Sequence, residues 1–299
     1  MKPAAIIFLC IALVISGCGF FLCRSAEKRA ERDGVELFSI STDDNGNRVS
    51  VLNYDTSKME KISVSLKKGT VNILEGDSCR VEIYNLFEGA YVKGISNNVL
   101  QINDTLGLAE IIKEGGLGIS FSGIRNYLHA IKPFTYDKWI NVYIPTGTPL
   151  NAVEITVLEG DIVMRGIRDT GADLFLTAKN GNISVENCST DNRMQLEAAQ
   201  GTVSVSGGFA NDLRATVEKG GIALSDGISF IQASLLVTGE GGIDLALSQS
   251  ISRMAVTLTA RDGITLNGTS LGTKEYVTAH SGGQTLTASA KRGAIRITD

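Results

Sequence analysis

The sequence predicts an all-β fold, a β-solenoid (β-helix-like) of coils of about 20 residues, behind an N-terminal transmembrane or lipoprotein anchor. A glycine-containing turn recurs at a nearly constant interval, and apolar residues alternate with other residues on both sides of it. The chain has 33 glycines but only 4 prolines, a balance that suits many tight turns between strands. Its hydrophobic content of 43% is ample for one continuous core.

The anchor is predicted for residues 1–23, of which residues 4–23 carry no charge. About twenty residues at ~1.5 Å each can cross a hydrocarbon core of ~30 Å as a helix. Within this segment Ile15-Ser-Gly-Cys18 resembles a bacterial lipobox, which makes Cys18 a candidate for lipidation. The apolar run continues past Cys18, so an uncleaved transmembrane helix is the alternative. Either reading makes the membrane a partner of residues 4–23.

Residues 24–57 are predicted to form a charged tether and lead-in. Basic residues follow the anchor directly, namely Arg24, Lys28, Arg29 and Arg32. The positive-inside tendency then favours a body on the cytoplasmic face of the membrane. The repetitive β body is similar to exported surface domains, which favours the opposite side. We expect an extracytoplasmic location, at the cell surface or in the envelope, and keep the cytoplasmic face as the alternative.

The repeat begins with a glycine turn, followed by an apolar residue, one variable residue and a second apolar residue. The first apolar positions are Ile162, Ile183, Val203, Ile222, Ile243 and Ile264, which lie 21, 20, 19, 21 and 21 residues apart. A turn repeated at one place in each coil favours a positive φ angle, which glycine adopts without steric cost.

A second alternating strand precedes each turn and puts its apolar side chains on one face. The apolar sets are Val153/Ile155/Val157, Leu174/Leu176/Ala178, Met194/Leu196/Ala198, Leu213/Ala215/Val217, Ala233/Leu235/Val237 and Met254/Val256/Leu258. In the last two sets the apolar positions lie one residue earlier relative to the turn. A turn that is one residue longer explains this shift, because otherwise every side chain would change face.

Two short strands cannot bury their apolar faces alone, so the coils must stack. Stacking aligns the six first apolar positions, from Ile162 to Ile264, in a continuous interior column. Each buried Ile or Val there should contribute ~1.5–3 kcal/mol by apolar burial. The coil of Ile295 and Ile297 comes last in the sequence, which leaves edge-to-edge dimerisation through it as an open alternative. The sequence does not fix the oligomeric state.

The predicted solenoid covers residues 58–299. The repeat signature recurs as Ile62/Val64/Leu66, as Gly69-Thr-Val71-Asn-Ile73 and as Gly293-Ala-Ile295-Arg-Ile297. Three further segments also read as strands: Val81-Glu-Ile83, residues 99–102 and residues 139–144.

An insertion at residues 104–137 breaks the rhythm of the repeat. Insertions of this kind often form the binding face of a repeat protein. Aromatic residues in and beside this one make up a candidate binding face: Phe121, Tyr127, Phe134, Tyr136 and Trp139. Aromatic side chains there can stack on sugars or contact a partner protein. A hydrophobic lid that covers the solenoid is the alternative.

The composition argues against several classes of function. A net charge of −4 and a pI near 5.4 provide no basic surface for nucleic acid. With only His129 and His280, the chain has little material for histidine catalysis or a histidine metal site, and we expect no cofactor and no metal. Cys79 and Cys188 are predicted to be two separate buried thiols, with a disulfide as the alternative.

The carboxylates do not form the aligned acidic pair that a polysaccharide-active solenoid needs. The offsets from the nearest repeat position differ among Asp161, Asp226, Asp244 and Asp262. Asp173 and Asp212 share an offset but lie two coils apart, and no His or Arg column is predicted to join them. His280-Ser281 lacks the surroundings of a catalytic serine. We therefore expect no catalytic residues.

The segment Trp139-Ile-Asn-Val-Tyr-Ile-Pro-Thr-Gly-Thr-Pro-Leu150 and the turn Gly160-Asp-Ile162 resemble the bacterial putative-adhesin family of β-repeat domains of unknown function. That family joins a V-x-[IV]-P-x-G strand to repeated G-[DN]-[IV] turns, and the resemblance covers residues 58–299. It implies an exported β-solenoid, often behind an N-terminal anchor. It carries over neither catalytic residues nor a ligand.

The function expected from the sequence is that of a non-catalytic, membrane-anchored extracytoplasmic β-repeat module. It would serve as an adhesin or envelope scaffold that binds a glycan, a wall polymer or a protein. A cytoplasm-facing, membrane-tethered regulatory domain is the alternative. A polysaccharide-active β-helix enzyme is less favoured.

Overall fold

The computed structural model describes residues 49–54, 59–85, 92–104, 138–168, 171–279 and 283–299. All of these except Val49 belong to one compact unit, Ser50–Thr105 with Asp137–Asp299. The predicted anchor with Cys18, most of the tether and residues 105–137 of the insertion lie outside the described residues. In the part that is described, no helix is long and apolar enough to span a membrane.

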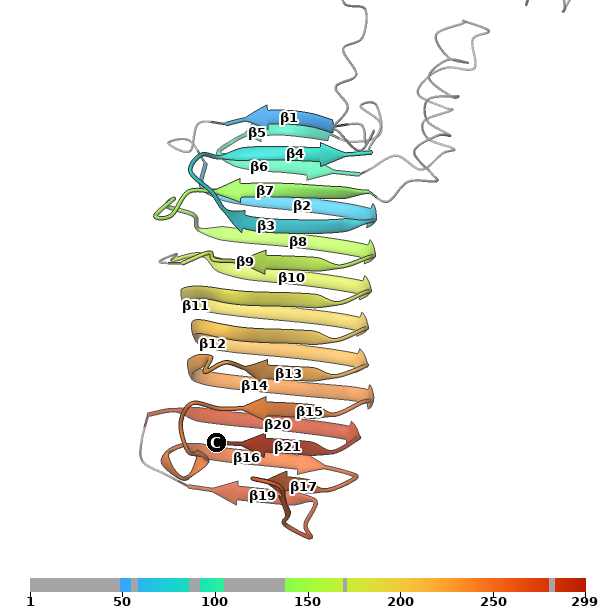
Figure 1. Ribbon diagram of the computed structural model, residues 1–299, viewed down its shortest axis with the longest axis vertical. Helices are drawn as coiled ribbons and strands as arrows, with labels where there is room; N and C mark the ends of the chain where they lie inside the picture. The colour runs from blue at the N-terminus through green and yellow to red at the C-terminus, as the bar shows by residue number, and fades with distance from the viewer. Residues whose placement is uncertain (1–48, 55–58, 86–91, 105–137, 169–170, 280–282) are drawn as a thin grey trace, which may run out of the picture. The chain divides into compact units, whose positions relative to one another are not determined.

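All described strands belong to one hydrogen-bonded sheet that winds into coils (Figure 1). They are β1 (Val49–Asn53), β2 (Lys61–Lys68), β3 (Thr70–Glu75), β4 (Arg80–Tyr84), β5 (Val92–Ser96), β6 (Val99–Asn103), β7 (Trp139–Ile144), β8 (Ala152–Glu159), β9 (Ile162–Arg165), β10 (Asp173–Asn180), β11 (Ile183–Gln200), β12 (Val203–Lys219), β13 (Ile222–Ser225), β14 (Ser229–Glu240), β15 (Ile243–Ala246), β16 (Ala255–Ala260), β17 (Ile264–Leu266), β18 (Thr269–Ser270), β19 (Glu275–Thr278), β20 (Thr285–Arg292) and β21 (Ile295–Thr298). A 3₁₀ turn, η4 (Ile251–Arg253), precedes β16.

Each coil consists of a strand before the glycine turn and a strand after it. The strands before the turn pair in parallel in a first layer, in the order β6, β2, β8, β10, β11, β12, β14, β20, β16. The strands after the turn pair in a second layer, in the order β7, β3, β9, β11, β12, β13, β15, β21, β17. The long strands β11 and β12 bend from the second layer of one coil into the first layer of the next. The predicted solenoid is confirmed.

The core lies between the two layers, where alternate side chains of each strand are buried. In β8, for example, Val153, Ile155 and Val157 are buried while their neighbours in the strand are not. The predicted interior column is confirmed from Ile162 to Ile243, because Ile162, Ile183, Val203, Ile222 and Ile243 pair in register in successive coils. Because the strands pair in parallel and in register, apolar residues at equivalent positions of successive coils stack on one another and form one continuous column.

The predicted longer turn is confirmed in the β14–β15 coil and is wrong for the β16–β17 coil, where Ala260 pairs with Ala290 and Ile264 with Ile295, so that the turn is one residue shorter than in the β20–β21 coil. The pairing of β14 with β20 shifts register between Val237 and Glu240, so β14 has one extra residue there. A bulge of this kind lets the chain keep the same side chains inside on both sides of the turn.

The order of the last coils differs from the sequence order. Ile243 pairs with Ile295, and Ile295 pairs with Ile264, so the β20–β21 coil lies between the β14–β15 coil and the β16–β17 coil. The predicted direct contact of Ile243 with Ile264 is therefore wrong, and so is the open end at Ile295 and Ile297, since both are fully buried with partners on both sides. Repeat spacing reports how long each coil is, but not which coils become neighbours.

The first coils are rearranged in the same way. The β2–β3 coil is the first in the sequence, yet it lies between the β6–β7 coil and the β8–β9 coil. At both ends of the described unit, the coil nearest the chain terminus therefore lies one coil in from the end of the stack, between two other coils (Figure 1). We call these two the clasped coils.

Antiparallel strands close the stack at its ends. In the first layer β5 pairs with β6 and β19 with β16. In the second layer β4 pairs with β7 and β18 with β17. Tyr54 and Leu52 at one end, and Leu271 and Tyr276 at the other, pack against the core. Short capping strands of this kind keep the parallel ladder from offering a long free edge.

Two connections carry the chain past the clasped coils. Residues 145–151 lead from β7 past β2–β3 to β8, and residues 247–254, with η4, lead from β15 past β20–β21 to β16. The first connection holds the Pro145-Thr-Gly147 turn, in which the Pro145 carbonyl accepts hydrogen bonds from Thr148 N at 3.2 Å and from its Oγ1 at 2.7 Å. This turn motif therefore sits where the chain must skip one coil.

Candidate functional site

Trp139 is the one member of the predicted aromatic face that falls within the described residues. Phe121, Tyr127, Phe134 and Tyr136 lie outside them. Trp139 begins β7 and is half-buried. Its role in a binding face can therefore be judged from the neighbours that β4 and β3 bring to it.

The antiparallel pairing of β4 with β7 places a group of large polar and aromatic side chains on the outer surface of the second layer. Val81 and Ile83 of β4, with Ile140 and Val142 of β7, are buried, so the alternate residues point outward. The pairs across the two strands are Tyr84 with Trp139, Glu82 with Asn141 and Arg80 with Tyr143, and Asn72 of β3 lies next to Asn141. We call these seven residues the β4–β7 patch.

The Glu82 carboxylate is the centre of the polar contacts in the β4–β7 patch. It accepts hydrogen bonds from Tyr84 Oη at 3.2 Å, Tyr143 Oη at 3.2 Å and Asn141 Nδ2 at 3.1 Å. It also forms an ion pair with Arg80 at 3.1 Å. With only 13% of the Glu82 side chain exposed, these contacts fix the orientation of the surrounding rings.

Aromatic contacts stand on both sides of this carboxylate. The rings of Tyr84 and Trp139 stack with their centroids 4.5 Å apart and an interplanar angle of 17°. At the other end, the Arg80 guanidinium lies 4.5 Å from the centroid of the Tyr143 ring, in a cation–π contact. Arg80 Nε is buried, and within the described part of the chain it has no hydrogen-bond partner. The patch is thus a rigid platform that presents aromatic, amide and guanidinium groups.

The amide ladder extends the polar row onto β3. Asn72 Nδ2 donates to Asn141 Oδ1 at 2.8 Å, and Asn141 Nδ2 donates to Glu82. Sequence reasoning identified Trp139 but missed the other six residues of the patch. Both strands were predicted, but their antiparallel pairing was not, because it lies outside the parallel repeat.

The family of the chain follows from a match over most of its length. The family model described as Toastrack DUF4097 matches residues 59–298. The chain belongs to the Toastrack DUF4097 family. This is a family of unknown function, and the assignment confirms the resemblance seen in the sequence. No curated protein matches the chain.

Several solved structures resemble this Toastrack chain. A putative adhesin from Bacteroides fragilis shares 14% identity, with 84% of this chain and 97% of that chain covered and a TM-score of 0.41. A putative adhesin from Parabacteroides merdae shares 12% identity, with coverages of 87% and 99% and a TM-score of 0.42. A putative lipid binding protein from Parabacteroides distasonis shares 12% identity, with coverages of 85% and 98% and a TM-score of 0.35. At these values no residue role carries over.

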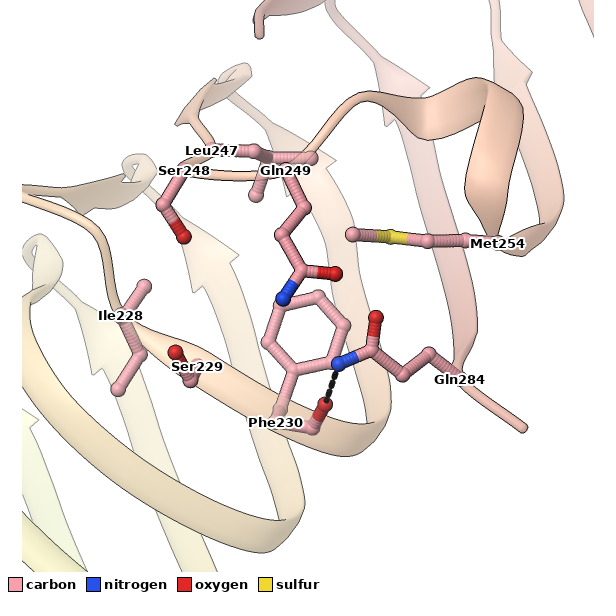
Figure 2. A pocket seen from close by; sticks show the side chains of 8 residues that line it. All are labelled: Ile228, Ser229, Phe230, Leu247, Ser248, Gln249, Met254 and Gln284. Atoms are coloured by element: carbon pink, nitrogen blue, oxygen red, sulfur yellow. Dashed lines mark hydrogen bonds between the residues drawn. The ribbon is translucent and has the colours of Figure 1, made fainter. Parts of the chain in front are cut away.

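Two small crevices lie on the described part of the Toastrack domain. One lies beside the connection past β20–β21, where Gln284 Nε2 donates to the Phe230 carbonyl at 3.1 Å and Met254 points toward the same space (Figure 2). The other lies beside the connection past β2–β3, between Pro145 and Arg168. Each holds about 10 Å³, room for about one water molecule. Neither can enclose a sugar or a cofactor.

Asp173 and Asp212 of the first layer contact Arg193 rather than forming an acidic pair. Arg193 lies between Asp173 and Asp212, with its backbone N 3.2 Å from Asp173 Oδ1 and its Nε 3.1 Å from Asp212 Oδ2. The expectation that no Arg joins these two acids is therefore wrong. Burial alone would raise the pKa of Asp212, but hydrogen bonds from Arg214 and Arg193 outweigh it and hold the pKa below its usual value. An ionised, paired carboxylate of this kind is a poor general acid.

Cys79 and Cys188 are both free and buried, as the sequence predicted. Burial raises the pKa of each thiol to about 11. A thiol of this kind stays protonated at neutral pH and is a poor nucleophile. Among the described residues, no group of three or more His, Cys, Asp or Glu side chains could hold a metal ion.

Proposed function

We propose that this Toastrack chain is a non-catalytic module of the cell envelope, anchored to the membrane through residues 4–23, with its β body on the extracytoplasmic side. In this proposal the β4–β7 patch is the surface that binds an envelope component, whether a glycan, a wall polymer or a protein. The observation that carries it is the convergence of Trp139, Tyr84, Tyr143 and Arg80 on one outer surface. Tryptophan, tyrosine and arginine are the side chains most enriched at the energetic centres of binding surfaces.

The geometry supports a binding role over catalysis in two ways. The two crevices beside the connections each have room for about one water molecule, so a group reacting there would stay in bulk solvent. The Glu82 carboxylate is held by four donors within the patch, an arrangement that suits a structural acceptor better than a proton shuttle.

Binding is tested by incubating the full-length chain with isolated envelopes of the source bacterium and measuring the bound fraction by sedimentation. Trp139→Ala should lower the bound fraction severalfold, because it removes the largest ring of the patch. Phe175→Ala, in β10 of the first layer, is the matched control and should bind as the unmodified chain does. Equal binding by all three chains would show that the patch is not the binding surface.

Location is tested by adding protease to intact cells and to lysed cells. Digestion of the body without lysis would support the extracytoplasmic proposal. Protection until the membrane is broken would contradict it and favour the alternative, a cytoplasm-facing regulatory domain. That alternative is motivated by the basic residues that follow the anchor, Arg24 to Arg32.

A further inference from the structure

We propose that the β4–β7 patch binds a chain of uncharged sugar residues that lies along the outer surface of the second layer. The inference rests on the proposed function, because it names the ligand class of the same surface. Three properties of the described patch lead to it: its flatness, its compensated charge and its alternation of aromatic and amide groups.

The shape of the patch excludes an enclosed ligand. Its seven residues stand on the outer face of three paired strands, and none of them lines either of the two crevices beside the connections. Trp139 and Tyr143 lie four residues apart on β7, which places them about 13 Å apart at ~3.3 Å per residue. A ligand that contacts both aromatic ends must therefore be extended, and an oligosaccharide satisfies this where a monosaccharide does not.

The charges of the patch and its border are compensated. Arg80 pairs with Glu82 at 3.1 Å, and on the neighbouring strand β9 Arg165 pairs with Glu186 at 2.8 Å. Lys138, just before β7, interacts electrostatically with Asp104. Attraction of a polyanion needs a cluster of uncompensated basic side chains. This surface is therefore complementary to an uncharged ligand.

The chemistry of the patch matches a sugar better than a protein. A pyranose offers an apolar C–H face and a rim of hydroxyl groups. The rings of Tyr84, Trp139 and Tyr143 can contact the apolar face, while the amides of Asn141 and Asn72, which Glu82 helps to orient, can exchange hydrogen bonds with the rim. A protein partner usually seals an apolar centre with a polar rim. Here the polar row lies in the centre, between two aromatic ends.

Trp139 is the single tryptophan of the chain, so its fluorescence reports on this patch directly. The full-length chain, solubilised in detergent, is titrated with three fractions of the source bacterium's envelope: uncharged polysaccharides, anionic polysaccharides separated by anion exchange, and proteins. The uncharged fraction should change the Trp139 emission saturably, and raising the salt to about 0.5 M should leave the affinity unchanged within twofold.

Matched variants then locate the contact. Tyr84→Ala should weaken binding of the uncharged fraction at least about tenfold, whereas Tyr84→Phe, which keeps the ring, should stay within about threefold of the unmodified chain. Phe175→Ala in the first layer serves as control and should not change the affinity. Thermal melts of each variant exclude loss of the fold as the cause.

The remaining outcomes separate this inference from the proposed function. A response only to the anionic fraction that weakens with salt, or only to proteins, would overturn the assignment of an uncharged sugar chain while leaving the patch as the binding surface. A response to the uncharged fraction that Tyr84→Ala does not weaken would overturn it as well. No response to any fraction would contradict both proposals.

Discussion

Gly201 shows why the turn of each coil requires glycine. Its φ angle is 143°, a value that side-chain-bearing residues rarely adopt. A Cβ added there would overlap the carbonyl oxygen of Gly181, the turn glycine of the neighbouring coil. The Gly201 N–H meanwhile donates to the Lys219 carbonyl at 2.9 Å, so the coils approach each other closely at this corner. The repeat therefore needs glycine both for its φ angle and for the space between coils.

Gly201→Ala should lower the free energy of unfolding by about 2–4 kcal/mol, because backbone strain and overlap add. Gly263 occupies the corresponding turn of the β16–β17 coil with a φ of 104°, but no atom lies within 4 Å of a Cβ built there. Gly263→Ala should therefore cost only the strain, about 1–2 kcal/mol. Urea denaturation measures the free energy of unfolding of both variants. Equal losses would show that the close approach of neighbouring coils at Gly201 does not add to the cost.

Asp299 is a residue whose charge ties three segments together. Its carboxylate accepts hydrogen bonds from Asn267 Nδ2 at 2.6 Å, Ser250 Oγ at 2.8 Å and Ile251 N at 2.8 Å. These bonds, with that from Asn267 the largest cause, lower the pKa of Asp299. A lowered folded-state pKa adds stability above the unfolded value near 4, and this stability is lost as the pH falls through the folded value.

Asp299→Asn should therefore lower the melting temperature at neutral pH, and the difference from the unmodified chain should shrink below about pH 4. Melts recorded from pH 7 down to about pH 2.5 test this. Asp191→Asn, at an exposed site in β11, is the control. A difference that stays constant over the whole pH range would show that the carboxylate charge is not involved.

Among the elements, β20 and β21 show where sequence reasoning reached its limit. The repeat signature of Gly293-Ala-Ile295-Arg-Ile297 was readable from the sequence, and Leu286, Ala288 and Ala290 of β20 are buried in alternation with less buried residues. The position of β20 and β21 between β14–β15 and β16–β17 was not readable, because all coils share the same apolar period and any two of them can pair in register. The β4–β7 patch escaped sequence reasoning for a related reason: which strand pairs with β7 depends on the chain path through the first coils.

Ile295→Asp tests the position of the β20–β21 coil. In the structure this side chain is fully buried between two coils, so a carboxylate there should unfold the body or cost at least about 4 kcal/mol. Thr287→Asp, an exposed position in the same coil, should change stability by less than about 0.5 kcal/mol. Circular dichroism melts compare the two. Tolerance of Ile295→Asp would favour a coil at the open end of the stack.

Across the whole described unit, the sequence predicted the fold class, the coil length, the interior column and the family. It could not predict how the stack ends, because capping depends on strands outside the repeat. Those strands are β1 and β5 at one end and β18 and β19 at the other. β5, β18 and β19 pair antiparallel with β6, β17 and β16, and β1 pairs with β4. A regular repeat therefore specifies the middle of a solenoid better than its ends.

Hydrogen exchange should report this arrangement. Amides in β5 and β19, at the outer edges, should exchange first, whereas those in the clasped strands β2 and β20 should be protected as well as those in β11 near the middle. Mass spectrometry of peptides after timed exchange measures this order. Protection that declines steadily from the middle of the sequence toward residues 61 and 298 would contradict the clasped order of the coils.

The clasped coils also determine how the unit would carry a mechanical load. A pull on the chain from its N-terminal side first meets the capping strand β1, which pairs with β4, and then acts along β2, which is bonded to β6 on one side and β8 on the other. A pull on the chain from its C-terminal side acts along β21, which is bonded to β15 on one side and β17 on the other. To detach either strand, two ladders must shear together, so the stack cannot be peeled apart one coil at a time from where the tension enters. A module tethered by one end and gripped elsewhere would remain folded under tension that unravels a solenoid whose coils stack in sequence order.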